Sequence, residues 1–198
     1  MTQGKIVILS GPSASGKTTL HNKLLENPRI RQKLFKSISA TTRAKRPGEK
    51  HGKDYLFLSM PMFRHKIKAG HFLEWQKVFD NYYGTPLKKV RELLKTGKFV
   101  LLCIDVKGAR VVWHKFPDAV KIFIQPPSIA ELEKRLVSRA SDSIKSVELR
   151  LKTAQQEMVQ AKDYDFVIIN DSLPTAYKRL ERIILEQLNT SSTANKIR

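Results

Sequence analysis

Short apolar runs divide the chain and predict the strands of a central sheet. They occupy residues 6–9, 35–39, 99–104, 120–124 and 166–170. Continuous runs of Ile, Val, Leu and Phe are typical of strands buried on both faces of a parallel sheet. Helical patterns lie between and after most of these runs. Strands that alternate with helices predict an α/β fold with a parallel sheet.

Apolar residues at helical spacing predict amphipathic helices between these strands. One helix has Thr85 as its expected N-cap, Pro86 at its first position and Gly97 as its end. Another begins in a capping-box pattern, Ser128 to Glu131. Two further stripes are Val147, Leu151, Ala154 and Met158, and Ala176, Leu180, Ile183, Ile184 and Leu188.

Residues 39–86 break this rhythm, because they contain no long helical stripe. Short strand-like pieces at 54–58 and 72–79 predict an inserted substrate-binding subdomain with short, mostly antiparallel strands. The expected organisation is a core domain of residues 1–38 and 87–188, the insertion at 39–86, a lid at 136–150 and a flexible tail at 189–198.

A glycine-rich loop follows the first predicted strand and precedes a predicted helix. Its residues fit the pattern G-x-x-x-x-G-K-[ST] at every position: Gly11, Pro12, Ser13, Ala14, Ser15, Gly16, Lys17 and Thr18. Glycines let successive backbone N–H groups point inward, and the helix adds its positive end. We expect Lys17 to reach the β- and γ-phosphates of a nucleotide and the Thr18 hydroxyl to ligate Mg²⁺. A glycine turn with an exposed lysine is the less favoured interpretation.

Composition adds a strong positive charge to this picture. The chain has 198 residues and a formal net charge of +19, which suits anionic partners such as nucleotides, nucleic acid or acidic membrane, or is simply solvated surface. Its single cysteine, Cys103, excludes a disulfide framework. The scattered histidines suggest no metal site, and no segment approaches a membrane span. These features favour a cytoplasmic protein.

The segment from Ser39 to Glu49 places hydroxyls and three cations next to a Pro-Gly turn. Two guanidinium groups, Arg43 and Arg46, would nearly neutralise a phosphate dianion. An exposed basic loop is the alternative. The hydroxyls of Tyr55, Tyr82 and Tyr83 could reach the same phosphate, although buried structural tyrosines are equally common.

Two carboxylates, Glu74 and Asp105, stand out in so basic a chain, and Asp105 follows a predicted strand at the edge where open α/β sheets bind ligands. A carboxylate accepts two parallel hydrogen bonds from the N1–H and 2-amino group of guanine but meets an acceptor on adenine. The pair therefore suggests guanine recognition, with a helix cap or a surface ion pair as the alternative for each.

Three arginines lie around the polar stretch that we expect to form a lid. They are Arg135, Arg139 and Arg150. Cations that close over transferring phosphates stabilise charge on the equatorial oxygens. Solvated helix faces are an equally weighted alternative.

Together these stretches resemble the guanylate kinases, which phosphorylate GMP from ATP. The resemblance runs from about residue 6 to 188, and its specific parts are SATTRAKRPGE, HGKDYLF, FLEW, NYYGT, IDVKG, IFIQPPS and VIIND. It implies a three-layer P-loop kinase fold and reversible Mg²⁺-dependent transfer of the γ-phosphoryl group from ATP to GMP. Nucleic acid is not required for that reaction, although the basic charge suits non-specific binding.

The resemblance also implies a role for each matching residue. The GMP phosphate ligands would be Ser39, Arg43, Arg46, Tyr55 and Tyr83, and the guanine contacts Glu74, Thr85 and Asp105. ATP would bind Gly11 to Thr19, which includes Thr18 and Thr19, together with Arg135, Arg139 and Asn170. The catalytic cations would be Lys17, Arg43, Arg139 and Arg150.

One departure concerns Cys103, which stands where the family typically has an aspartate. A thiol does not order a magnesium-bound water as a carboxylate does, so we expect an effect on turnover or metal affinity. The alternative functions are a catalytically weak guanylate-kinase-like module that binds phosphopeptide or nucleic acid, and another nucleoside monophosphate kinase.

Overall fold

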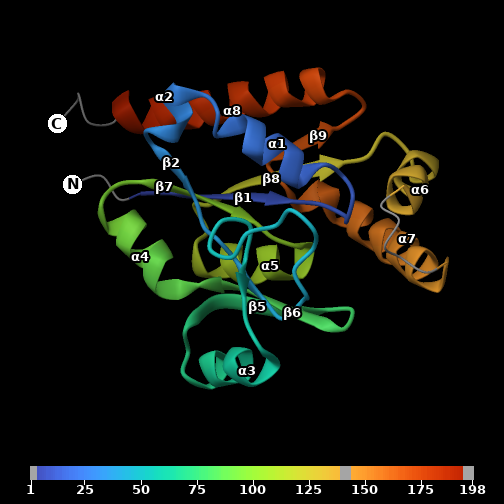
Figure 1. Ribbon diagram of the computed structural model, residues 1–198. Helices are drawn as coiled ribbons and strands as arrows, with labels where there is room; N and C mark the ends of the chain where they lie inside the picture. Colours follow the sequence, from blue (N-terminus) through green and yellow to red (C-terminus); the bar gives the residue numbers. More distant parts are fainter. Residues whose placement is uncertain (1–3, 139–143, 194–198) are drawn as a thin grey trace.

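A five-stranded parallel sheet forms the centre of the protein. The computed structural model describes residues 4–138 and 144–193 (Figure 1). The strands lie in the order β2-β7-β1-β8-β9, and every neighbouring pair is parallel. Their bounds are β1 Ile6–Ser10, β2 Leu34–Lys36, β7 Phe99–Cys103, β8 Val120–Gln125 and β9 Phe166–Ile169. The predicted α/β fold with a parallel sheet is confirmed.

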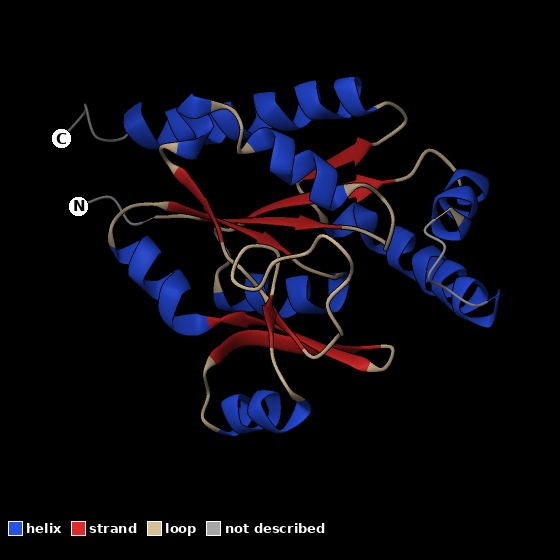
Figure 2. Cartoon of the chain, viewed as in Figure 1, coloured by secondary structure: helices blue, strands red, loops and turns tan. Residues whose placement is uncertain are grey.

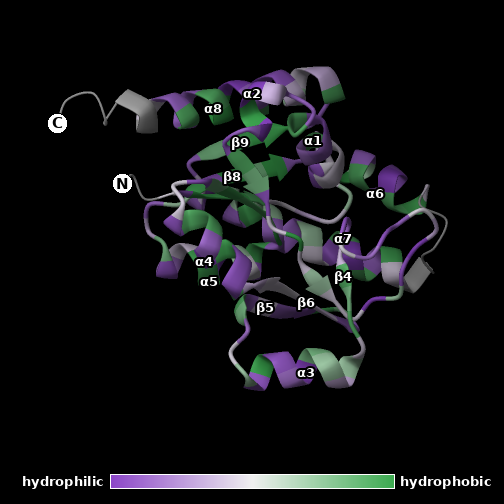
Figure 3. Ribbon diagram, turned by 60° about the vertical axis from the view of Figure 1, so that its left-hand side comes forward, coloured by the Kyte–Doolittle hydropathy of each residue, from purple (hydrophilic) through white to green (hydrophobic). Residues whose placement is uncertain are grey.

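Helices cover both faces of this sheet, as Figure 2 shows. Alternate residues of β1 enter different cores, because successive side chains of a strand point to opposite faces. Val7 packs in the cluster that contains α1 (Lys17–Leu24) and α8 (Leu173–Thr193), whereas Ile8 packs with α4 (Leu87–Lys95) and α5 (Val106–Lys115). The central strands are accordingly apolar, and the outer helices carry the polar residues (Figure 3).

A second, smaller sheet lies beyond α5. Its strands are β4 (Leu56–Phe57), β3 (Ala40–Thr41), β6 (Asn81–Pro86) and β5 (Phe72–Val78), in that order. The β3–β4 pair is parallel, and the β3–β6 and β5–β6 pairs are antiparallel. Figure 1 shows α5 between the two sheets, and Lys115 Nζ at the end of this helix donates to the Leu73 carbonyl of β5 at 2.6 Å.

Three helices of the described residues had no predicted counterpart, and the four-residue α2 (Pro28–Arg31) is one of them. Helix α3 (Met60–Lys68) lies in the stretch that we expected to be free of long helices, and only Phe63 of this helix is buried. Its apolar stripe, Met60, Phe63 and Ile67, is short and only partly buried, so it gives a weak helical signal. Helix α5 follows Asp105 directly and includes Gly108, which lowers helix propensity.

The expected cap of α4 is wrong. Thr85 belongs to β6, and the helix begins at Leu87 with Pro86 at the N-cap position. The Thr85 hydroxyl donates to Glu74 instead of the helix backbone, so a tertiary partner replaces the local one. The predicted cap of α6 (Ile129–Val137) is confirmed, because Ser128 Oγ accepts from the Glu131 amide at 3.1 Å.

The remaining helix ends differ slightly from the sequence pattern. Helix α7 (Ile144–Met158) begins before the predicted stripe, and a short 3-10 helix (Val159–Asp163) follows it. Helix α8 continues past Leu188 to Thr193. Residues 139–143, in the expected lid, and 194–198, in the expected tail, lie outside the described residues. The domain boundaries stay a prediction.

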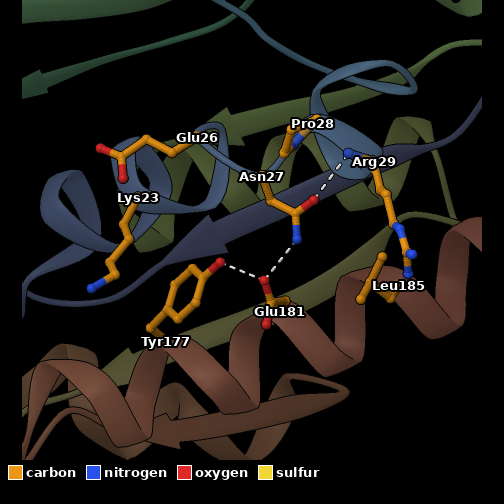
Figure 4. Close-up of a pocket in the computed structure, with 8 residues that line it drawn as sticks. All are labelled: Lys23, Glu26, Asn27, Pro28, Arg29, Tyr177, Glu181 and Leu185. Atoms are coloured by element: carbon orange, nitrogen blue, oxygen red, sulfur yellow. Dashed lines mark hydrogen bonds between the residues drawn. The ribbon is translucent and has the colours of Figure 1, made fainter.

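A surface pocket of about 660 Å³ separates the end of α1 and the start of α2 (Pro28–Arg31) from α8 (Figure 4). Glu181 of α8 accepts hydrogen bonds from Tyr177 and, at 2.8 Å, from Asn27 Nδ2, and these bonds lower the pKa of Glu181. Lys23 lies 5.2 Å from the centre of the Tyr177 ring. None of the predicted site residues lines this pocket. These contacts hold the C-terminal end of α1 beside α8, whereas the phosphate loop lies at the N-terminal end of α1.

Candidate active site

The glycine-rich loop connects β1 to α1 and takes the conformation that its glycines allow. Gly11 and Gly16 have φ angles of 138° and 98°, a region that side chains rarely adopt. A Cβ atom at Gly11 would lie 2.2 Å from the Ile124 carbonyl oxygen, and one at Gly16 would lie 2.1 Å from Asn170 Nδ2. Both positions therefore require glycine.

Asn170 directly follows the edge strand β9 and joins this strand to the loop. Its Nδ2 donates to the Ser15 carbonyl at 2.7 Å, and its own carbonyl accepts from Arg135 Nη2 at 3.1 Å. Arg135 Nε also donates to Glu131 Oε1 at 2.9 Å. Arg135 is thus held against the loop rather than on a solvated helix face.

Lys17 curls back over its own loop. Its ammonium group donates to the carbonyls of Gly11 and Pro12, at 2.7 Å each. The charge therefore lies in the concavity that the loop forms. Thr18 and Thr19 follow it in the first turn of α1 and are exposed, so their hydroxyls can be reached from solvent.

Glu74 and Asp105 meet at the beginning of α5. Glu74 is 5% exposed and its Oε1 accepts from the Thr85 hydroxyl at 2.6 Å. Its other oxygen lies so close to Gly108 that a Cβ atom there would be 2.6 Å away. Asp105 Oδ1 accepts from the Gly108 amide at 2.7 Å. Asp105 therefore caps α5 through one carboxylate oxygen, which is compatible with a guanine contact through the other, and the surface-ion-pair alternative is wrong for Glu74.

Burial shifts the protonation of these carboxyl groups. It raises the pKa of Glu74 to about 7, against the hydrogen bond from Thr85 and with added repulsion from Asp105. Burial also raises the pKa of Asp105, although the Gly108 amide and Lys17 lower it. Paired acids in a low-dielectric site resist ionising together, so a ligand that donates hydrogen bonds to Glu74 must bind its ionised form.

Arg43 lies in an aromatic and acidic environment. Its guanidinium contacts Glu49 Oε1 and the Ala44 carbonyl, at 2.7 Å each, and lies 5.4 Å from the Tyr55 ring centre and 5.8 Å from that of Phe57. Only 13% of the Arg43 side chain is exposed. It is therefore not an exposed loop cation.

Tyrosines of the second sheet separate onto its two faces. Tyr83 lies edge-on to Tyr55, with ring centres 6.0 Å apart, so these two hydroxyl-bearing rings share a face with Arg43. Tyr82, the next residue along β6, packs instead against Phe63 and Trp75. The structural alternative holds for Tyr82. Ser39 and Arg46, the other two predicted phosphate ligands, are half-buried.

Arg150 of α7 contacts the insertion. Its guanidinium carbon lies 5.3 Å from the ring centre of Phe79, at the tip of the β5–β6 hairpin. Its Nε donates to Ser146 Oγ at 3.3 Å. Arg139 lies outside the described residues, so the structure places two of the three predicted lid arginines.

The sequence analysis missed Glu157 of α7 and the acceptor role of Glu49. Burial raises the pKa of Glu157 to about 7, Lys17 lowers it, and Asp105 raises it. Glu157 is next to the apolar Met158 in sequence, but a single acid beside a stripe gives no distinct signal. Glu49 could have been noticed, because an acid within a cationic segment is a natural partner for Arg43.

Cys103 ends β7 beside two cations. Burial raises the pKa of its thiol, whereas Lys17 and Lys36 lower it. Within residues 4–138 and 144–193, no group of three or more His, Cys, Asp or Glu side chains forms a metal site. No helix in these ranges is long and apolar enough to span a membrane.

The fold and the loop together define a P-loop kinase of the α/β class. A family model described as guanylate kinase matches residues 3–187. The curated guanylate kinase of Haemophilus ducreyi is 47% identical over 193 residues, covering 96% of this chain and 93% of that protein. The guanylate kinase of Lactobacillus johnsonii is 42% identical over 185 residues, covering 92% and 88% respectively.

A solved structure agrees with these relatives. The crystal structure of guanylate kinase from Anaplasma phagocytophilum has a TM-score of 0.78 and 36% identity, and the match covers 94% of this chain and 87% of that one. The chain belongs to the guanylate kinase family, and it is an enzyme with guanylate kinase activity. The individual site residues stay predictions.

Proposed function

We propose that this site transfers the γ-phosphoryl group of ATP reversibly to GMP, giving ADP and GDP. One observation carries the assignment: Glu74 and Asp105 converge on Gly108, where a Cβ atom would lie 2.6 Å from Glu74 Oε2 and 3.5 Å from Asp105 Oδ1. The charge of Lys17 also lowers the pKa of Asp105, so the proposed base-reading acids would lie near the phosphate-loop lysine. This is the arrangement that transfer between two bound nucleotides requires.

Guanine would bind at the acid pair. The N1–H and 2-amino group of the base would donate to Glu74, whose position the Thr85 hydroxyl fixes at 2.6 Å. Asp105 would accept from the same edge of the base. Charge-assisted bonds of this kind contribute about 1.5–3 kcal/mol each, and adenine offers an acceptor where guanine offers N1–H. The pair therefore favours GMP over AMP.

The phosphate of GMP would bind among the cations and hydroxyls of the second sheet. The proposed ligands are Ser39, Arg43, Arg46, Tyr55 and Tyr83. The Arg43 guanidinium already has an anionic partner, Glu49, at 2.7 Å. Phosphate would join or replace this carboxylate at a fork-shaped donor that suits either group. Glu49 thus keeps Arg43 oriented before the substrate arrives.

ATP would bind the loop from Gly11 to Thr19, with Arg135, Arg139 and Asn170 beside it. Lys17 would exchange the carbonyls of Gly11 and Pro12 for the β- and γ-phosphates. Mg²⁺ prefers oxygen and retains several waters, and the exposed Thr18 hydroxyl fits this preference as one protein ligand. The ion would neutralise charge on the phosphates, and Cys103 would not serve as a ligand.

Positioning and charge neutralisation would supply the catalysis. Phosphoryl transfer needs no covalent intermediate on the protein. Lys17, Arg43, Arg139 and Arg150 would stabilise the charge that spreads over the transferring group. Binding of both nucleotides is expected to draw the insertion and the lid region over the phosphates and expel water, which protects ATP from hydrolysis.

The test is ADP formation from MgATP with GMP, with AMP or without an acceptor, at one enzyme concentration. Turnover with GMP alone supports both the reaction and the role of the acid pair. Equal turnover with AMP would overturn the proposed base recognition. A folded sample that binds GMP but produces no ADP would instead indicate the binding-module alternative.

A further inference from the structure

The turn between β5 and β6 holds an aromatic residue where glycine is usual. Val78 pairs with Asn81, so Phe79 and Asp80 form a two-residue hairpin turn. Phe79 has a φ angle of 54°. Two-residue turns with a positive φ at their first residue are dominated by glycine, because a Cβ atom disfavours this region.

Backbone strain at a non-glycine residue often marks a functional constraint. Among the described residues, Ala14 and Phe79 are the non-glycine positions with positive φ. Ala14 lies in the phosphate loop, at the centre of the site. Strain of this kind persists where the surroundings impose it and is common at functional sites. A glycine would form the Phe79 turn more easily but would place no ring at the tip.

The Phe79 ring reaches an arginine from another part of the fold. The Arg150 guanidinium lies 5.3 Å from the ring centre, within the range of about 6 Å for a cation–π interaction. Phe79 belongs to the second sheet, whereas Arg150 belongs to α7, which packs with α6 and the phosphate loop residue Ala14. The contact therefore connects the GMP side of the site with the ATP side.

We propose that Phe79 is a positioning residue that couples binding on the GMP side to the placement of Arg150 over the transferring phosphate. This inference rests on the proposed role of Arg150. A ring face attracts a guanidinium without neutralising its charge, so Arg150 keeps its affinity for phosphate. A carboxylate in place of the Phe79 ring would form an ion pair that phosphate must break. Movement of the hairpin tip then moves Arg150 with it.

Substitutions at Phe79 separate the ring from the shape of the turn. Phe79→Leu removes the ring and keeps an apolar side chain, whereas Phe79→Tyr keeps the ring face. We expect Phe79→Leu to lower kcat about two- to fivefold, the range that an exposed cation–π contact supports. Affinity for GMP alone should stay at the parent value, and Phe79→Tyr should retain the parent kcat. Thermal unfolding and GMP binding of each variant verify that it is folded.

A double-mutant cycle with Arg150→Ala identifies the partner. If Phe79 acts through Arg150, adding Phe79→Leu to Arg150→Ala should cause no further loss of kcat. An equal loss in both backgrounds would overturn the proposal, as would parent kcat in Phe79→Leu. A Phe79→Tyr variant as slow as Phe79→Leu would assign the effect to the turn and also overturn it.

The same cycle separates this proposal from the proposed function. If Arg150→Ala retains the parent kcat, the assigned role of Arg150 is wrong, and the coupling proposal fails with it. If Arg150→Ala is slow while Phe79→Leu is not, the role of Arg150 stands and the coupling alone fails. Binding of ADP with and without GMP gives a second readout: Phe79→Leu should reduce the effect of GMP on ADP affinity.

Discussion

The protonation of Glu74 should control GMP affinity near neutral pH. Burial raises the pKa of this carboxyl to about 7 in the protein without nucleotide. Guanine donates two N–H groups, so it binds the ionised form. A group with a raised pKa is largely protonated below pH 7 and must lose its proton on binding. GMP affinity should therefore rise as pH increases through 7.

The size of this effect follows from the pKa. With a value of about 7, roughly a tenth of the free protein is ionised at Glu74 at pH 6 and roughly nine tenths at pH 8. Because apparent affinity scales with the competent fraction, the Kd for GMP should fall about tenfold over this range. The GMP phosphate loses its second proton at about pH 6. This ionisation adds its own pH dependence to the Kd for GMP.

Glu74→Gln isolates the contribution of the carboxylate. Calorimetric Kd values for GMP and AMP would be measured at pH 6, 7 and 8 for both proteins. The variant should keep the slope due to the phosphate and lose the part due to Glu74. At pH 8 it should bind GMP about 10- to 100-fold more weakly, the equivalent of one charge-assisted bond, with a reduced preference over AMP. Identical pH slopes in parent and variant would refute the reasoning.

Three further variants test the rest of the site. Lys17→Ala should lower kcat about 100- to 1000-fold while GMP binding measured by calorimetry stays unchanged; parent turnover would contradict the phosphate-loop assignment. Cys103→Asp should raise activity or the apparent Mg²⁺ affinity by up to about tenfold. A variant with the parent's turnover and the parent's magnesium titration would show that Cys103 limits neither. Burial raises the pKa of Glu157 to about 7, so the folded protein binds the extra proton and stability falls as pH rises from ~4.5 through 7. Glu157→Gln should remove about 1–3 kcal/mol of that fall in urea unfolding; an unchanged pH profile would place Glu157 in solvent.

Central strands and the phosphate loop could be predicted from the sequence, because their signals are local. A strand buried on both faces is apolar at every position, as Ile6 to Leu9 are, and the loop needs its glycines within eight residues. Helix α3 buries one side chain, and α5 contains a glycine that Glu74 requires. Helix α5 also has apolar residues at helical spacing, Val106, Ala109 and Val112, so this helix could have been predicted, whereas α3 gives a weaker signal.

The same distinction explains the errors around the site. Thr85 before Pro86 fits a helix cap locally, but its hydroxyl donates to Glu74 across the hairpin. Glu157 and Phe79 face the site only because α7 and the hairpin tip are brought together by the fold. A side chain whose partner lies far away in the sequence leaves no spacing to recognise.

These contacts also indicate which part of the insertion can move. Leu73 is buried in the core with α5, and its carbonyl accepts from Lys115 at 2.6 Å, so the root of the β5–β6 hairpin is fixed to the central domain. Glu74 is at this root. Phe79 lies five residues further along, about 17 Å at the rise of an extended strand. If Glu74 reads the base as proposed, recognition takes place where the hairpin is fixed to the central domain, and the contact with Arg150 forms at the tip, away from this anchor.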